Sequence, residues 1–124
     1  MHVQPNAVPR PVVLVVARAE ALETYRGYLS SDLSVFAVTD LDEARLTLRD
    51  CKIGGVITEC CLDGGQKGAD ILNALSADGF RGVMALRACS IGCFEGLKLP
   101  EGVITMDYIP TAARELRARV WAAQ

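Results

Sequence analysis

The chain has 124 residues, of which 51% are apolar, and this is enough to bury the core of one domain. A formal net charge of -2, with the 13 basic residues scattered along the chain, disfavours nucleic acid and membrane surfaces as partners. The longest apolar run, Pro11 to Ala17, is much shorter than the roughly 20 residues that cross a bilayer. No secretory signal is recognisable, so the five cysteines are expected to stay reduced thiols in a cytoplasmic protein.

Residues 1–10 are expected to form a flexible tail, because prolines at positions 5 and 9 resist helix formation, and residues 11–124 to form a single domain. In the domain, short β-branched runs alternate with longer segments of helical periodicity, which predicts parallel strands joined by helices. Several of these runs are apolar throughout, as expected for strands covered on both faces. The predicted strands are Val12 to Ala17, Ser34 to Thr39, Gly55 to Glu59, Gly82 to Arg87 and Gly102 to Asp107.

Apolar residues at helical spacing fill the segments between these strands. Asp40 followed by Glu43 is a capping-box pattern, which starts one helix at Leu41. The fourth connection, Ala88 to Gly102, contains internal glycines and a proline, so its helix is expected to be short or frayed. The remaining helices are predicted around Leu22, Tyr25 and Leu29, from Gly68 to Gly79, and from Thr111 to Ala123.

Five strands and about five helices in strict alternation predict an α/β fold with a doubly wound, flavodoxin-like parallel sheet. In such sheets, binding and chemistry gather where the carboxyl ends of the strands meet. The segments at those ends are therefore the candidates for a functional site. They are Ala17 to Glu20, Glu59 to Asp63, Arg87 to Ser90, and Asp107 to Pro110.

Four of the predicted strand ends carry, in order, the segment VVARAE (residues 15–20), Glu59, Arg87, and Ile109 with Pro110. Over residues 11–123 this arrangement resembles the CheY-like receiver domains of bacterial response regulators. Receivers carry an acidic pair after the first strand, a phosphate-accepting aspartate at the tip of the third, a Ser or Thr ending the fourth, and Lys-Pro ending the fifth. The resemblance implies a five-stranded sheet in the order 2-1-3-4-5 and a role in two-component signalling.

The reactive residues of a receiver are replaced at each matching position. Ala17 and Arg18 stand where receivers keep the acids that hold Mg²⁺, so neither a tight metal site nor a cofactor is expected. Glu59 keeps a carboxylate but moves it one methylene outward, which by the resemblance partly imitates a phosphorylated aspartate. Either Arg87 or Arg18 is expected to hold this carboxylate directly, because a guanidinium pairs well with it.

The remaining positions extend the degenerate pocket. Arg87 replaces the hydroxyl residue, Ile109 replaces the lysine, and Pro110 is expected to keep the cis peptide that receivers have at this turn. Asp63 is the nearest aspartate to the strand tip and is the alternative phosphoacceptor. Around Glu59, the predicted switch pocket comprises Ala17, Arg18, Glu20, Asp63, Arg87, Ile109 and Pro110.

Four cysteines follow two strands that the resemblance makes neighbours: Cys60 and Cys61 follow the third strand, and Cys89 and Cys93 follow the fourth. Zinc accepts four thiolates, although adjacent cysteines are a poor pair of ligands. A thiolate close to an arginine is instead oxidisable and can act as a redox sensor. The third interpretation is that the cysteines pack as small buried apolar residues.

The sequence contains no catalytic constellation, so an enzyme is not expected. The preferred interpretation is a pseudo-receiver that regulates a protein partner, or a second copy of itself in a homodimer, without phosphorylation. A working phosphoacceptor and a thiol-based redox or zinc sensor are the two alternatives. By the resemblance, the interaction face lies on the fifth strand and the last helix and comprises Met106, Tyr108, Arg114, Arg117 and Trp121.

Overall fold

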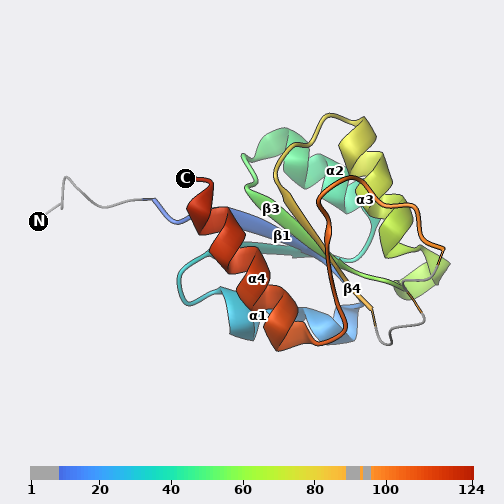
Figure 1. The fold of residues 1–124 in the computed structure, drawn as a ribbon, viewed down its shortest axis with the longest axis horizontal. Helices are drawn as coiled ribbons and strands as arrows, with labels where there is room; N and C mark the ends of the chain where they lie inside the picture. Colours follow the sequence, from blue (N-terminus) through green and yellow to red (C-terminus); the bar gives the residue numbers. More distant parts are fainter. Residues whose placement is uncertain (1–8, 89–92, 94–95) are drawn as a thin grey trace, which may run out of the picture.

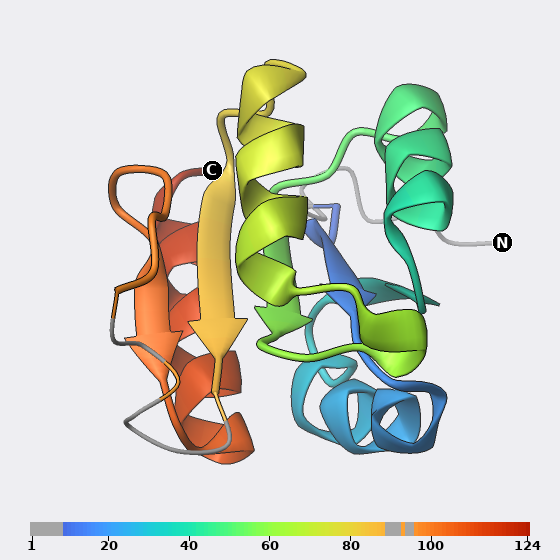
Figure 2. The same cartoon turned by 90° about the vertical axis from the view of Figure 1, so that its right-hand side faces the viewer.

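The computed structural model describes residues 9–88, 93 and 96–124, and the described residues contain one parallel sheet of five strands. The strand order is β2-β1-β3-β4-β5, which confirms the predicted fold class and order. Figure 2 shows the strands with their arrowheads at one common edge. The strands are β1 (Val12–Val16), β2 (Ser34–Val38), β3 (Gly55–Glu59), β4 (Val83–Arg87) and β5 (Ile104–Met106).

Helices cover both faces of the sheet (Figure 1). On one face, α1 and α4 pack over Val13, Val15 and Ile57, and on the other α2 and α3 pack over Leu14 and Val56. This alternation follows from the two-residue period of a strand, which sends successive side chains to opposite faces. The helices are α1 (Leu22–Leu29), α2 (Leu41–Asp50), α3 (Gly68–Ala77) and α4 (Ile109–Ala122).

The burial of the strands explains their composition. All five residues of β3 are buried, because the strand lies in the middle of the sheet with helices on both sides. The edge strand β2 instead alternates between exposed and half-buried residues until Val38. Glu59 is therefore a charged residue at the end of a fully buried strand. No described helix is both long and apolar enough to cross a membrane.

Two helix starts differ in detail from the predicted ones. Asp40 caps α2 as expected, since its carboxylate accepts from the backbone N–H of Glu43 at 2.8 Å, but the Glu43 side chain bonds Thr39 instead of closing the capping box. Helix α4 begins at Ile109, and Pro110 lies in its first turn. The predicted cis peptide before Pro110 is wrong: the bond is trans, as the continuous helical path from Ile109 requires.

The connection from β4 to β5 differs from the predicted strand–helix alternation. Its described residues, Ala88, Cys93 and 96–103, contain no α-helix. Gly96 and Gly102 have φ angles of 70° and 82°, a conformation that interrupts a right-handed helix. Helix α3 supports this segment, because the Asn73 amide donates to the carbonyl of Lys98 at 2.7 Å. The described part of the domain thus has four α-helices instead of about five.

Gly68 allows α3 to begin directly against the tip of β3. Its N–H donates to the carbonyl of Cys60 at 3.0 Å. A Cβ atom at this position would overlap the carbonyl oxygen of Glu59 and lie 2.8 Å from Cδ1 of Leu86. The absence of a side chain at Gly68 therefore fixes how closely the helix approaches the end of the strand.

Replacing Gly68 with alanine is expected to lower the free energy of unfolding by about 2–4 kcal/mol, because backbone atoms cannot make room for the methyl group. Gly27→Ala is the matched control: Gly27 lies inside α1 with nothing within 4 Å of the added Cβ. That substitution is expected to stabilise the protein by about 0.5–1 kcal/mol through helix propensity. Urea unfolding of both variants checks the pair, and equal stabilities would contradict the close approach at Gly68.

Candidate functional site

The carboxyl ends of β1, β3 and β4 bring three charged residues of the predicted switch pocket together. In the sheet, Glu59 at the end of β3 is in register with Arg87 at the end of β4. Arg18 follows the end of β1, on the other side of β3. The parallel sheet therefore places a carboxylate between two guanidinium groups that are 41 and 28 residues away along the chain.

The Glu59 carboxylate is 2% exposed and both of its oxygens accept hydrogen bonds. Oε1 accepts from the backbone N–H of Arg18 at 3.3 Å and from Nε of the same residue at 3.2 Å. Oε2 accepts from Nη1 of Arg87 at 2.9 Å and from the hydroxyl of Tyr25 at 3.2 Å. Arg18 and Arg87 thus both hold Glu59, each through one oxygen.

The two arginines differ in their other surroundings. Arg18 is partly exposed and also pairs with Glu20, Nη1 to Oε1 at 2.9 Å. The Arg87 side chain is only 20% exposed, and its Nε is buried without a hydrogen-bond partner among the described residues. An unpaired buried donor is costly. The ion pair with Glu59 is therefore the main interaction that offsets the free-energy cost of burying the Arg87 guanidinium.

Tyr25 belongs to the candidate site, although the sequence predicts it only as part of the apolar stripe of a helix. It is fully buried in α1, and its hydroxyl donates to the Glu59 carboxylate. Burial raises the pKa of Tyr25, and the negative charge of Glu59 raises it further, so the hydroxyl stays protonated and donates. A tyrosine in a core stripe was the available signal, since a buried phenol needs a hydrogen-bond partner.

The residues present at this edge do not fit Mg²⁺. The metal prefers oxygen ligands, but Ala17 offers no side-chain oxygen and Arg18 brings a positive charge. Both oxygens of Glu59 already accept from cations. Asp63, the alternative phosphoacceptor, is exposed, and its Oδ2 accepts from the backbone N–H of Ala19 at 3.0 Å. Asp63 therefore ties the loop after β3 to the loop after β1.

The remaining members of the predicted switch pocket lie at the start of α4. Ile109 is half-buried and packs against the core beneath α1 and α4, and Pro110 lies in the first helical turn. The polar network around Glu59 is instead built from residues that follow β1, end β3 and β4, and lie in α1. The structure thus brings Arg18, Glu59 and Arg87 together in one network and gives Ile109 a packing role.

Two members of the predicted interaction face, Arg117 and Trp121, are engaged in contacts within the domain. Arg117 pairs with Asp32 through Nε at 2.8 Å and also donates to the carbonyl of Tyr28. The indole N–H of Trp121 donates to the other oxygen of Asp32 at 3.0 Å. Both side chains therefore fasten α4 to the loop between α1 and β2.

The outer part of that face is open to solvent. Tyr108 is 63% exposed, the largest value among the exposed large apolar residues. Arg114 is also exposed, whereas Met106 is half-buried and packs against the core. Of the predicted face, Tyr108 and Arg114 are the members most accessible to a partner.

The cysteines after β3 take opposite environments. Cys60 is buried, Cys61 is exposed, and their sulfur atoms are 3.8 Å apart. Cys93 is half-buried and packs against the same core layer as Cys60. Cys89 lies outside the described residues. In the described part of the chain, no group of three or more His, Cys, Asp or Glu side chains is arranged to hold a metal ion.

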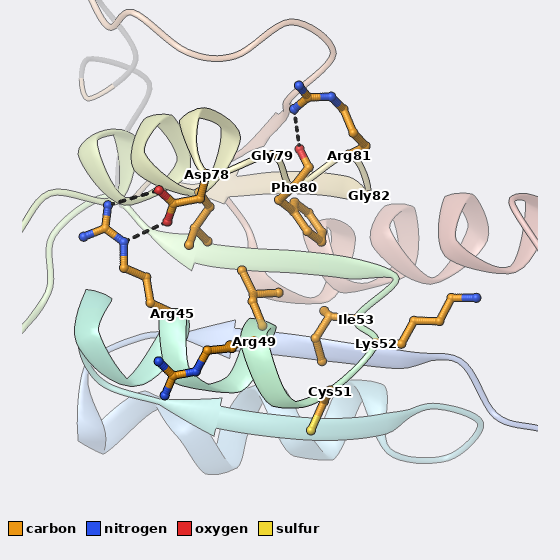
Figure 3. A pocket seen from close by; sticks show the side chains of 12 residues that line it. Arg45, Arg49, Cys51, Lys52, Ile53, Asp78, Gly79, Phe80, Arg81 and Gly82 are labelled. Atoms are coloured by element: carbon orange, nitrogen blue, oxygen red, sulfur yellow. Dashed lines mark hydrogen bonds and ion pairs between the residues drawn. The ribbon is translucent and has the colours of Figure 1, made fainter.

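Two pockets differ in their relation to this site. A hollow of about 170 Å³ lies over the carboxylate and is lined by Arg18, Glu59, Cys60, Cys61 and Arg87. A larger pocket of about 470 Å³ lies at the opposite end of the sheet between α2 and α3, where Arg45 pairs with Asp78 (Figure 3). None of the predicted site residues is among the described residues that line this larger pocket.

The fold is shared with solved receiver domains. The signal receiver domain of an HD domain-containing protein from Pseudomonas fluorescens Pf-5 is 15% identical, with a TM-score of 0.72 over 97% of this chain and 96% of that one. A response regulator receiver protein from Pseudomonas putida is 20% identical, with a TM-score of 0.67 over 95% and 100%. One from Clostridium thermocellum is 18% identical, with a TM-score of 0.64 over 93% and 94%. No family model and no curated protein sequence matches, and the chain has the fold of CheY-like receiver domains.

Replacing Arg87 with methionine is expected to lower the free energy of unfolding by about 3–5 kcal/mol, because Glu59 would lose a cation while buried. The control is the same substitution in a Glu59→Gln background, where no negative charge needs compensation. There the loss is expected to be much smaller. Urea unfolding of the four proteins measures the coupling, and equal losses in both backgrounds would contradict a direct ion pair.

The Tyr25 hydroxyl predicts how stability depends on alkaline pH. The pKa of Tyr25 is raised in the folded protein, so above pH about 10 the unfolded chain loses this proton while the folded protein keeps it. Stability is therefore expected to fall as pH rises past that point, and Tyr25 contributes about 1.4 kcal/mol per pH unit to the slope. The free energy of unfolding of Tyr25→Phe is expected to fall less steeply between pH 9 and pH 11 than that of the wild-type protein. Parallel plots of this free energy against pH for the two proteins would contradict the prediction.

Proposed function

We propose that the protein is a pseudo-receiver, a non-enzymatic signalling module that regulates a protein partner without accepting phosphate. The observation that carries this proposal is the Glu59 network. A buried carboxylate at the tip of β3 is held by Arg18, Arg87 and Tyr25. We infer that this position corresponds to the phosphoacceptor of a receiver. In this proposal, Arg18 and Arg87 supply the positive charge that a receiver obtains from Mg²⁺. Glu59 supplies the negative charge that a receiver obtains from the phosphoryl group.

The network opposes phosphoryl transfer to Glu59. An attacking carboxylate oxygen needs a free lone pair directed at phosphorus, and a cation must neutralise charge on the transferred group. Each oxygen of Glu59 already accepts two hydrogen bonds from within the domain. Arg18 would have to release Oε1, or Arg87 and Tyr25 would have to release Oε2, before that oxygen could attack. Glu59 is thus better suited to hold one conformation than to react.

The contacts continue from the network toward the face that we propose for binding. Directly after Arg87, the N–H of Ala88 donates to the carbonyl of Met106 at 2.9 Å, which joins the end of β4 to the end of β5. Tyr108, two residues further on, projects into solvent. We assign the output to this exposed edge, with a protein of the same cytoplasmic pathway or a second copy of the chain as the partner.

Titrating the ¹⁵N-labelled protein with Mg²⁺ and then with beryllofluoride tests the proposal. We expect no saturable shift of the Arg18, Glu59 and Arg87 amides, because the internal cations already occupy the carboxylate. A receiver domain with its acidic pair and aspartate intact is the positive control under the same conditions. Saturable shifts at Glu59 that extend to Tyr108 would instead identify a working phosphoacceptor and overturn the proposal.

A further inference from the structure

A second pocket beside the Glu59 network concentrates nucleophilic side chains. It has a volume of about 270 Å³, and its lining includes three cysteines, Cys60, Cys61 and Cys93, together with Lys67. Cys60 and Cys61 also line the smaller hollow over Glu59, so both cysteines are shared by the two pockets. The hydrogen bonds described for Glu59 come from Arg18, Arg87 and Tyr25, so the chemistry of these thiols is a separate question.

The fold holds Cys61 and Lys67 next to each other. The two residues form an antiparallel bridge that closes the loop after β3, supported by a hydrogen bond from the N–H of Leu62 to the carbonyl of Gln66 at 2.9 Å. Across this bridge Nζ of Lys67 lies 3.7 Å from Sγ of Cys61. The backbone pairing therefore holds the two residues opposite each other, within reach of this side-chain contact.

Two donors converge on the sulfur of Cys61. Besides the Lys67 ammonium, the thiol of Cys60 lies 3.8 Å from it. Cys61 is exposed, whereas Cys60 is buried in the core. Exposure together with nearby donors is the environment in which a cysteine reacts with disulfides and peroxides.

We propose that Cys61 is a thiol–disulfide exchange site that takes up a low-molecular-weight disulfide of the glutathione class. The Cys61 thiolate attacks one sulfur of the disulfide, the bond between the two sulfurs breaks, and a new bond joins Cys61 to one half. The other half leaves as a thiolate and takes a proton from solvent, replacing the one that Cys61 released. Cys61 is oxidised and the small disulfide is reduced, so electrons balance without another reagent.

Lys67 assists the step electrostatically. In the transition state, one negative charge is shared by three sulfur atoms in line. An ammonium 3.7 Å from the attacking sulfur stabilises that charge where it begins. Lys67 is thus a positioning residue for the exchange, and the reacting atom is the sulfur of Cys61.

The mixed disulfide is a better product than a bond between Cys60 and Cys61. Neighbouring Cα atoms across a trans peptide are about 3.8 Å apart, closer than the usual range for a disulfide. No cis peptide occurs in the described chain. A small disulfide entering from solvent meets Cys61 first, and its adduct would cover the hollow over Glu59. The exchange chemistry does not depend on the proposed pseudo-receiver function.

The test is to incubate the full chain with oxidised glutathione, quench with acid, and map the adducts by peptide mass spectrometry over time. Cys51 is the internal control, because it is half-buried where Cys61 is exposed, and it too has a lysine, Lys52, beside it in sequence. We expect Cys61 to gain one glutathionyl group about tenfold faster than Cys51 in the folded protein. In denaturant the two rates should converge. Equal rates in the folded protein would overturn the assignment.

Charge removal tests the role of Lys67. Lys67→Met is expected to slow modification of Cys61 about threefold, whereas the control Lys52→Met should leave that rate unchanged. In the wild-type protein, added salt should slow the same reaction, which gives a second readout that needs no variant. A rate that responds neither to Lys67→Met nor to salt would overturn the electrostatic assistance.

Discussion

The buried charge of Glu59 is the constraint on which this edge of the molecule depends. A carboxylate that is withdrawn from water must be compensated by well-placed donors, or the fold loses several kcal/mol, about 3–5 for a broken buried pair. Arg18, Arg87 and Tyr25 provide that compensation from two strand ends and one helix. The ends of β1, β3 and β4 and the position of α1 are therefore fixed by one side chain, in addition to the apolar packing beneath them.

Around this charge, the sheet keeps the strand order of the CheY-like receiver fold. The close approach of α3 at Gly68 keeps the tip of β3 enclosed. The loops above carry a different chemistry, in which Asp63 bonds backbone and Cys61 lies beside Lys67. The residues in these loops can differ without loss of the fold, because the apolar layers that stabilise it lie on the two faces of the sheet and not in the loops.

The predictable parts of the structure are those that depend on local pattern. The apolar run of β3 and the cap at Asp40 follow from periodicity and side-chain chemistry, and the matching strand tips led to Glu59, Arg18 and Arg87. The role of Tyr25 was missed because a buried tyrosine in a helical stripe looks the same whether its hydroxyl meets a carboxylate or a carbonyl. The prediction of a cis peptide before Pro110 was wrong, because this proline lies in the first turn of α4 and takes the trans peptide of a helix.

The compensation of Glu59 by side chains of the same chain also determines how long this charged arrangement lasts. A phosphorylated carboxylate is made by one reaction and removed by another, so its signal decays at a rate set by hydrolysis. A network in which Arg18, Arg87 and Tyr25 all bond Glu59 arises with folding and persists until the molecule unfolds or is degraded. Under the proposed function, the amount of output would therefore be set by how many copies of the domain are present, so that synthesis and turnover would take the place of a kinase and a phosphatase.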